Sequence, residues 1–463
     1  MLDLRITPHR PYLQAQCPVP QKLFLLVQVQ AQAQIRTCRP PVALVFVVDT
    51  SGSMRELVTL PDQTTGRMVE VDGRLYEEAI GGKTKQDLLL AALHGVADLT
   101  DLTPKDQFAL VRFDDKASVV APLGIATARD RFHQQVEALK HFSGGTMMGQ
   151  GLRLALQELN RVTTPTNRRV VLLTDGQTQD EAHCRELVRQ FTYQNIAITT
   201  VGVGSEYNED LLADLAAQTQ GQPVHVVLGA AQPPSISVSQ LPQWFAQQWQ
   251  AMSQEVITGL TLQVRTVRDV TLDRITRVYP FQAEVDPALS PVPLGNLDAH
   301  EPSLFVLEFS LPTRSVMRVR LAQLSFSYTV PGLDQTGTTE VQDVVVEFSD
   351  DPAVTGQIDT EVMGYVQQRN LDALVQQATQ QARHNPQQAA HTLTLARQMT
   401  QRLGNTTLTL ALDRAALELK QTGTLSPDTT KTVRIGVKTQ TLKLGSSGAN
   451  LPAEAEIRRL TGA

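Results

Sequence analysis

Cysteine is scarce in this chain of 463 residues, with three copies at Cys17, Cys38 and Cys184. Their number is odd and their spacing is wide, so the sequence contains neither a disulfide framework nor a zinc-binding pattern of cysteines. Unpaired cysteines are typical of a reducing compartment. We therefore expect a cytoplasmic protein in which the three thiols are ordinary small apolar side chains.

Long apolar runs, aromatic residues and excess basic charge are also missing. No apolar run approaches the roughly 18 residues of a membrane-spanning helix. Within residues 22–34, a short apolar core gives way to alternation with glutamine, the pattern of a strand and not of a secretion signal. The formal net charge is -6 and aromatic residues make up 5% of the chain. A nucleic-acid binder would need a basic face or stacking platforms, so we expect neither a membrane span nor a nucleic-acid partner.

The chain is long enough for two or three domains, and its patterns change along its length. Between residues 41 and 230, short apolar strands alternate with amphipathic helices, which predicts a mostly parallel sheet covered by helices on both faces. Between 256 and 350 nearly every segment is strand-like and turn signals separate the segments, which predicts an antiparallel sandwich. Alanine and leucine then recur at helical spacing, with breaks at 384–387, 402–406 and 422–427.

The predicted segments in order are the N-terminal strands (1–40), an α/β domain (41–230), a linker and helix (231–255), the β-sandwich (256–350), a helical bundle (357–434) and a C-terminal strand with a flexible tail (435–463). Two tryptophans, Trp244 and Trp249, lie five residues apart in the helix of the linker segment. We expect them to seal a joint between domains.

The strongest chemical signal follows the apolar run of residues 42–48, which ends on Asp49. Ser51 and Ser53 follow at alternate positions. A second buried strand ends just before Asp175, and Thr146 lies in a glycine-containing loop before a helix. In a parallel sheet these strand ends meet at one edge, where ligands bind. Carboxylate and hydroxyl oxygens suit a hard divalent ion, Mg²⁺ or Mn²⁺, and one coordination position can stay open for an outside carboxylate.

These residues carry a family resemblance. Asp49-x-Ser51-x-Ser53, Thr146 and Asp175 resemble the metal-ion-dependent adhesion site of von Willebrand factor A domains, with all five positions filled. The resemblance covers roughly residues 40–230. It implies a Rossmann-like sheet with a metal ion at its edge that bridges to an acidic residue of a partner protein. The resemblance also implies that the two aspartates hold the ion largely through water, that the three hydroxyls contact it directly, and that Thr146 changes with conformation. The alternative is a decayed site in which the serines only cap a helix.

The wider architecture resembles bacterial cytosolic proteins similar to inter-alpha-inhibitor and calcium-activated chloride channel regulators. Strands on both sides of the α/β domain indicate that residues 1–40 pair with 256–350. The expected fold class is therefore α/β, a Rossmann-like domain inserted in an antiparallel β-sandwich and followed by a C-terminal helical region. Residues 430–444 also look like the ending of the cytosolic members.

One segment departs from the family pattern. Residues 55–82 are long for a connection between a strand and its helix, and the alternation on either side of Asp72-Gly73 predicts a hairpin. This hairpin emerges beside Ser53, so we expect it near the metal. The sequence leaves three interpretations of this hairpin: it contacts a partner, it supplies an internal carboxylate to the metal, or it is a solvated surface hairpin. The candidate internal carboxylates are Glu56, Asp62, Glu70 and Glu77.

Three functions compete at this stage. The leading one is a metal-dependent interaction module that grips an Asp or Glu of a partner protein. The second is an accessory subunit of an AAA+ ATPase of the MoxR or magnesium-chelatase type, since this chain lacks a GxxxxGK[ST] loop of its own. The third is a phosphatase-like enzyme with Asp49 as nucleophile. That chemistry needs a second acid where Ser51 stands, and no histidine or lysine is placed as a general base, so we expect no enzymatic activity.

Overall fold

The computed structural model describes residues 1–59, 63–71 and 74–445. The chain divides into two compact units, one of residues 1–38 with 256 onward and one of residues 39–255. We call them the framework unit and the inserted unit. The predicted insertion of an α/β domain into the chain of a β-sandwich is confirmed. The inserted unit extends beyond residue 230 and includes the segment predicted as linker and helix.

The inserted unit is built on a seven-stranded sheet with the order β12-β11-β10-β9-β4-β7-β8. All pairs are parallel except β7 and β8. The interior strand β4 is buried along its whole length, which is why its sequence is a continuous apolar run. The strands are β4 (Val42–Asp49), β7 (Gln107–Phe113), β8 (Ala117–Ile125), β9 (Asn167–Thr174), β10 (Ala197–Val203), β11 (Pro223–Val227) and β12 (Ile236–Ser237).

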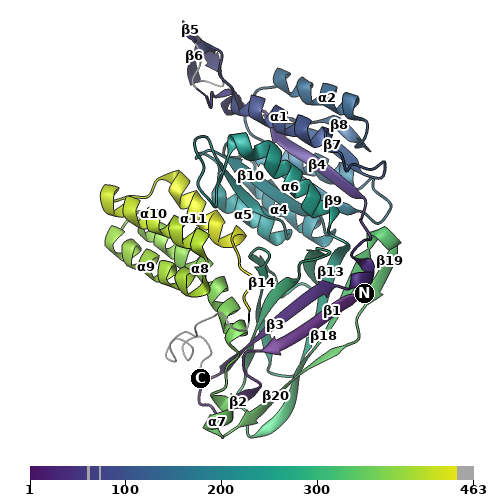
Figure 1. The fold of residues 1–463 in the computed structure, drawn as a ribbon, viewed down its shortest axis with the longest axis vertical. Helices are drawn as coiled ribbons and strands as arrows, with labels where there is room; N and C mark the ends of the chain where they lie inside the picture. Colours follow the sequence, from purple (N-terminus) through teal and green to yellow (C-terminus); the bar gives the residue numbers. More distant parts are fainter. Residues whose placement is uncertain (60–62, 72–73, 446–463) are drawn as a thin grey trace. The chain divides into compact units, whose positions relative to one another are not determined.

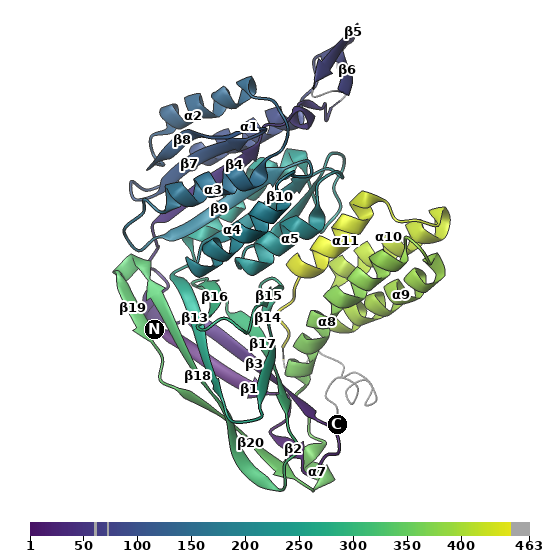
Figure 2. The same cartoon turned by 180° about the vertical axis from the view of Figure 1, so that it is seen from behind.

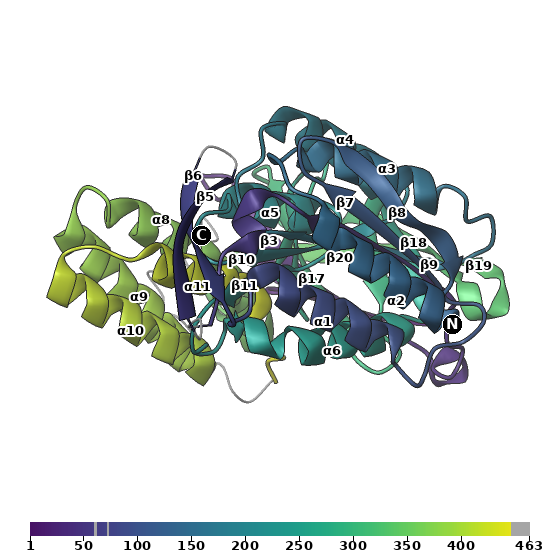
Figure 3. The ribbon, with the colours of Figure 1, turned by 90° about the horizontal axis from the view of Figure 1, so that it is seen from above.

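Helices cover both faces of this sheet (Figures 1 and 2). One face packs against α1 (Lys85–Ala97), α2 (Arg129–Glu137) and α6 (Leu241–Ser253), and the other against α3 (Met148–Leu159), α4 (Glu181–Tyr193) and α5 (Glu209–Gln218). The view from above shows the two helix layers on either side of the strands (Figure 3). Trp249 packs edge-on against Phe108 with ring centroids 5.3 Å apart. Both tryptophans of α6 belong to the core of this unit, because α6 covers the sheet, and their expected role at a joint is replaced by one in the core.

Asn167, the first residue of β9, holds both ends of the inserted unit. Its backbone N–H donates to the Pro41 carbonyl at 2.9 Å. Its side-chain Nδ2 donates to the Met252 carbonyl and to Glu255 Oε2, each at 2.8 Å. The segments that enter and leave the unit therefore meet at one buried residue, and Arg169 adds an ion pair to Glu255.

A two-stranded hairpin, β5 (Gln63–Val71) and β6 (Arg74–Ile80), interrupts the chain between β4 and α1. It projects away from the sheet at the end where β4 finishes (Figure 1). The predicted hairpin is confirmed in its two strands, while the Asp-Gly turn at 72–73 lies outside the described residues.

The framework unit is a sandwich of two sheets. The first has the order β1-β3-β17-β14-β15 and the second β16-β13-β18-β20-β2, with β19 paired to β18. The N-terminal strand β3 lies between β1 and β17, so residues 1–40 do pair with the later strands. The strands are β1 (Leu2–Pro8), β2 (Tyr12–Gln14), β3 (Gln21–Ala31), β13 (Ile257–Thr266), β14 (Thr271–Tyr279), β15 (Ala283–Val285), β16 (Val292–Leu297), β17 (Ser303–Leu311), β18 (Met317–Val330), β19 (Gln335–Thr338) and β20 (Gln342–Ser349).

The helical region begins with the short α7 (Pro352–Thr355) and continues with α8 (Thr360–Gln381), α9 (Pro386–Leu403), α10 (Thr406–Thr422) and α11 (Pro427–Thr439). The predicted breaks at 384–387, 402–406 and 422–427 overlap the connections between these helices, and the first lies partly inside α9. Helix α8 packs on the outer face of the first sheet, where Met363 and Val366 meet Phe24 and Val306. The buried Arg369 of α8 donates to Glu308 of β17 at 2.9 Å.

The predicted C-terminal strand from residue 435 is not formed; helix α11 runs through Thr439 and no strand follows over 440–445. The alternation of Val433, Ile435 and Val437 has the period of a strand. Ser426, however, caps a helix that has proline at its first position, and Val433 and Val437 share a helical face in the core of the bundle. The flexible tail predicted after residue 445 lies outside the described residues. Within the part of the chain that is described, no helix is long and apolar enough to cross a bilayer.

His9, which follows β1, gives a pH dependence to the framework unit. It is fully buried, and its Nδ1 accepts a hydrogen bond from the Phe24 backbone at 3.1 Å. Burial, with a smaller effect of the Arg10 charge, lowers the pKa of His9 to about 3. An unfolded histidine takes up a proton near pH 6.5, so the stability tied to a neutral His9 is complete above that pH and declines as the pH falls toward 3.

We expect the wild type to lose about 1.4 kcal/mol more stability than the His9→Asn variant between pH 7.5 and 5.5. Asparagine keeps an acceptor for the Phe24 N–H but does not titrate. Urea denaturation at the two pH values measures the difference. Equal losses in the two proteins would contradict the assignment.

Candidate metal centre

Three loops gather at the carboxyl edge of the inserted sheet. Asp49 is the last residue of β4, and Asp175 directly follows the neighbouring strand β9. Ser53 lies in a short 3₁₀ turn, Gly52–Arg55, and Thr146 lies just before α3. Adjacent parallel strands bring their ends together, so residues far apart in sequence meet here.

Hydrogen bonds join four of the sequence-predicted residues. Asp49 Oδ1 accepts from the Ser51 backbone N–H at 2.8 Å. The Ser51 and Ser53 hydroxyls are 3.1 Å apart, and Ser53 Oγ donates to Asp175 Oδ1 at 2.7 Å. The fifth residue, Thr146, lies beside this group.

Gly176 shows where the Thr146 hydroxyl lies. A Cβ built at this glycine would be 3.9 Å from Thr146 Oγ1 and 4.0 Å from Ser53 Oγ. Both hydroxyls therefore face the same glycine, directly after Asp175. All five sequence-predicted residues are brought to one edge of the sheet, and all but Ser53 are buried.

Asp49 is the electrostatically unusual member of the group. It is fully buried, and its hydrogen bonds come from neutral groups, the Ser51 N–H and the Thr174 hydroxyl at 2.6 Å. Burial, followed by the negative charge of Asp175, raises the pKa of Asp49 to about 7. Two buried carboxylates that disfavour each other's charge make a site that a cation would stabilise.

Lys85, the first residue of α1, was missed by sequence reasoning. Its Nζ donates to Asp175 Oδ2 and to Glu56 Oε2, each at 2.7 Å. Burial alone would lower the pKa of Lys85, but the charges and hydrogen bonds of Asp175 and Glu56 raise it. The lysine neutralises Asp175 from one side and leaves Asp49 without a cationic contact of its own. No local pattern could have indicated it, because Lys85 and Asp175 are 90 positions apart.

The four acids considered as internal ligands are accounted for as follows. Glu56 forms an ion pair with Lys85, and Lys85 forms another with Asp175, so Glu56 is linked to Asp175 through the lysine. Glu70 and Glu77 are exposed on the hairpin. Asp62 lies outside the described residues.

Backbone contacts fix the loop that carries Thr146. The Thr146 carbonyl accepts from Thr178 Oγ1 at 3.1 Å and from the Gln179 N–H at 3.0 Å. On its other side, Asp115 Oδ1 accepts from the Gly145 N–H at 2.8 Å. The Gly52 N–H donates to the Gly144 carbonyl at 3.2 Å. The three loops are therefore connected to one another, and a shift of one would be felt by the others.

The donor set fits a hard divalent ion. It consists of carboxylate and hydroxyl oxygens, with no nitrogen or sulfur among the five residues. Among the described residues there is no group of three or more His, Cys, Asp or Glu side chains able to hold a metal, so the fit depends on Ser51, Ser53 and Thr146 supplying oxygens. In that arrangement Asp49 and Asp175 would supply the negative charge.

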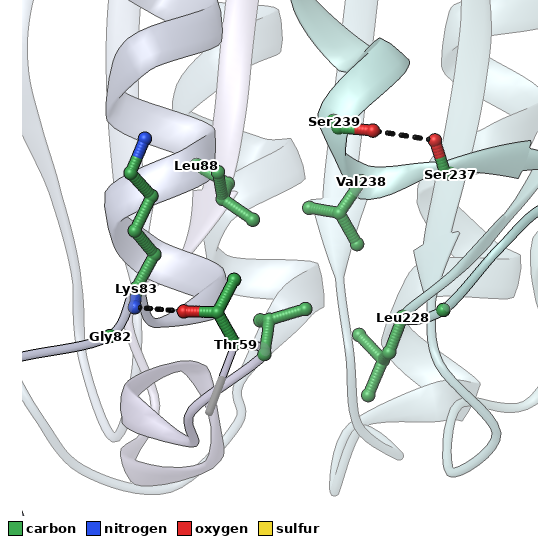
Figure 4. Close-up of a pocket in the computed structure, with 10 residues that line it drawn as sticks. Thr59, Gly82, Lys83, Leu88, Leu228, Ser237, Val238 and Ser239 are labelled. Atoms are coloured by element: carbon green, nitrogen blue, oxygen red, sulfur yellow. Dashed lines mark hydrogen bonds between the residues drawn. The ribbon is translucent and has the colours of Figure 1, made fainter. Parts of the chain in front are cut away.

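An open cleft lies at the base of the hairpin (Figure 4). Its volume is about 540 Å³. On one side Lys83 N–H donates to Thr59 Oγ1 at 2.7 Å, and on the other Ser237 and Ser239 hydroxyls are 2.8 Å apart. The cleft is lined by Val58, Thr59, Gly82, Lys83, Leu88, Leu228, Gly229, Ser237, Val238 and Ser239. It adds a surface of mixed polarity next to the start of α1.

Comparison with known families identifies the domain. The model of the von Willebrand factor type A domain matches residues 78–232. The chain therefore contains a von Willebrand factor type A domain, a class that generally serves as a metal-dependent protein-interaction module and is usually not enzymatic. The match includes Thr146 and Asp175 and begins within the second hairpin strand β6, so Asp49, Ser51 and Ser53 lie upstream of it.

Known relatives extend over most of the chain. An uncharacterized protein of Synechocystis is 25% identical over 344 residues, which is 72% of each chain. Among solved structures, a von Willebrand factor type A protein from Catenulispora acidiphila has a TM-score of 0.74 at 16% identity, covering 96% of this chain and 97% of that one. The ArnB paralog VWA2 from Sulfolobus acidocaldarius has a TM-score of 0.57 at 15% identity, covering 96% and 99%. At these identities the structural likeness establishes the fold.

Asp49→Asn tests the electrostatics of the centre. Without divalent metal, we expect this variant to unfold roughly 2–4 °C above the wild type, because it removes one of two buried carboxylates that repel each other. This is the shift that ~1 kcal/mol gives in a unit of this size. With Mg²⁺, the wild type should gain stability and the variant should not. Thermal unfolding in EDTA and in Mg²⁺ measures both effects.

Asp214→Asn serves as a control, since it changes an exposed acid of the same unit. It should respond to Mg²⁺ like the wild type. An Asp49→Asn variant that was less stable in EDTA and kept the full response to Mg²⁺ would refute the electrostatic assignment.

Proposed function

We propose that the inserted unit binds Mg²⁺ or Mn²⁺ through Asp49, Ser51, Ser53, Thr146 and Asp175, and that the bound ion grips an Asp or Glu side chain of a partner protein. The observation that carries the proposal is the environment of Asp49. A fully buried carboxylate with neutral hydrogen-bond partners, close enough to Asp175 to raise its pKa, lacks a compensating cation. A divalent ion bound by both aspartates would supply it.

The chemistry of the site favours binding over catalysis. An ion held by two carboxylates and neutral hydroxyls retains Lewis acidity for an incoming carboxylate. The position two residues after Asp49 is Ser51, so an aspartyl nucleophile would lack the acid partner that phosphatase chemistry requires. Lys85 is already committed to Asp175 and Glu56.

The hairpin supports a role in partner choice. It is joined to the centre at its base, where the Val58 N–H donates to the Lys83 carbonyl at 2.8 Å, two residues before Lys85. Its strands expose Met68 and Leu75, whose relative accessible surfaces are 56% and 68%. Exposed apolar side chains on a hairpin whose base adjoins the proposed site are suited to contact a protein. We therefore propose that β5 and β6 select the partner protein and that the ion binds its carboxylate.

Partner capture from native lysate tests the function. We expect wild type in Mg²⁺ to retain a protein that is lost with Asp49→Ala and with wild type in EDTA, because the ion forms the bridge. Glu186→Ala, an exposed acid on α4, should retain it. If all four samples captured the same proteins, the ion would not be the bridge. If the captured protein were an AAA+ ATPase, the chain would act as its accessory subunit.

Replacing both Met68 and Leu75 by serine tests the hairpin separately. Capture should weaken by roughly tenfold or more, equivalent to ~1.4 kcal/mol, while the stability gain with Mg²⁺ stays at the wild-type value. Leu410→Ser is the matched control, since Leu410 is 54% exposed on α10. Undiminished capture by the hairpin variant would show that β5 and β6 do not contact the partner.

A further inference from the structure

A pair of histidines connects α1 and α2 on the inserted unit. His94 lies in the last turn of α1, and His133 lies in α2, the neighbouring helix in Figure 1. Their ring centroids are 4.8 Å apart and the interplanar angle is 27°, so the rings meet by their nitrogen edges. The two Nδ1 atoms face each other at 2.6 Å. The rings are 27% and 28% exposed, so solvent and ions can reach them.

The Nε2 atom of each ring is hydrogen-bonded to a carboxylate from the other helix. His94 Nε2 is 2.9 Å from Glu137 Oε1 of α2, and His133 Nε2 is 3.0 Å from Asp98 Oδ1 at the end of α1. The two helices thus carry the same spacing, a histidine followed four residues later by an acid, and each acid serves the other helix's ring. Sequence reasoning missed the pair, because the spacing within one helix does not reveal the partner helix.

The carboxylates fix the tautomers of both rings. An ionised carboxylate only accepts hydrogen bonds, so each Nε2 must carry the proton. In the neutral imidazoles both Nδ1 atoms then carry lone pairs, and these point at each other. Two lone pairs at this distance repel unless an electrophile lies between them, either a shared proton or a metal ion.

The arrangement matches the way proteins prepare histidine for a metal. Ligating histidines commonly donate their other N–H to a carboxylate, which orients the ring and strengthens it as a ligand. Imidazole nitrogen selects zinc, copper or nickel over magnesium and calcium. With zinc–nitrogen bonds of about 2.0–2.1 Å in a tetrahedral site, the two nitrogens would sit about 3.3 Å apart. The partly exposed rings need to separate by less than an ångström and to turn both Nδ1 lone pairs toward one point, and water can complete the coordination.

We propose that His94 and His133 form a transition-metal site, with Zn²⁺ as the representative ion, bound through the two Nδ1 atoms and oriented by Glu137 and Asp98. This site is separate from the adhesion-type centre. His94 is nine residues along α1 from Lys85, a rise of about 13 Å, and the ligand chemistry differs. The carboxylates also balance the charge of a divalent ion. Bound metal would cross-link α1 to α2 and stabilise the folded unit by mass action.

Zinc titration of the full-length chain in excess Mg²⁺ tests the proposal, with a competing chromophoric chelator as the readout at pH 7.5. Asp49→Asn is included in every protein so that the other centre takes no zinc. We expect one zinc equivalent to be lost in His94→Gln and in His133→Gln. His391→Gln, which changes an exposed histidine on α9, should retain it.

Asp98→Asn supplies a second, independent test. It leaves both ring nitrogens in place and should weaken zinc binding by about tenfold or more if the carboxylate orients His133. Zinc should raise the unfolding temperature of the protein that carries Asp49→Asn alone, and should not raise that of the His94 and His133 variants. Circular dichroism checks that these variants are folded. Equal zinc binding by the parent and both histidine variants would overturn the proposal and leave the two rings joined by a shared proton alone.

Discussion

The unfavourable proximity of Asp49 and Asp175 is the constraint on which the edge of the inserted sheet depends. Both carboxylates are buried at the ends of adjacent strands, where neither can be solvated by bulk water. Nearly every polar group around them reduces this cost: the Ser51 N–H and the Thr174 hydroxyl bind Asp49, and Ser53 and Lys85 bind Asp175. The hydrogen-bond partners of Asp49 are neutral, and burial together with the Asp175 charge raises its pKa to about 7. Keeping a carboxyl group in such a place is costly for stability alone, and this cost is the basis of the proposed divalent ion.

Much of this centre was predictable from sequence because its elements are local patterns. An unbroken apolar run ending on Asp49, two serines at alternate positions and a second strand ending before Asp175 all lie within short windows. Lys85 and Asp115 were not predictable, because their roles arise only when the sheet brings distant loops together. The same is true of His94 and His133, which meet across two helices. Local periodicity also gave one wrong prediction. The alternating residues 433–437 indicated a strand, but they lie in a capped helix that packs in the bundle.

The hairpin explains a further mismatch between sequence pattern and domain. In the structure, β4 with Asp49 is an interior strand of the sheet, yet the family match begins at residue 78. Residues 55–84 separate the segment of Asp49, Ser51 and Ser53 from helix α1. The hairpin strands pair with each other, and its base is closed by an isolated bridge between Leu57 and Thr84 and by the hydrogen bond from Val58 to Lys83. Because the described residues of the hairpin strands pair only with each other, the sheet and α1 pack as they would without the insertion. The sequence of the hairpin can therefore change without altering the packing of the core.

The clasp at Asn167 has a mechanical consequence. The inserted unit is joined to the rest of the chain by two covalent crossings, before Arg39 and after Glu255, and both crossing segments are fastened to one asparagine at the start of β9. Strand β9 leads directly to Asp175. Tension applied at the carboxyl edge of the sheet would therefore travel along β9 to that asparagine and be shared between two connections in parallel. A double connection of this kind lowers the load that either segment carries alone.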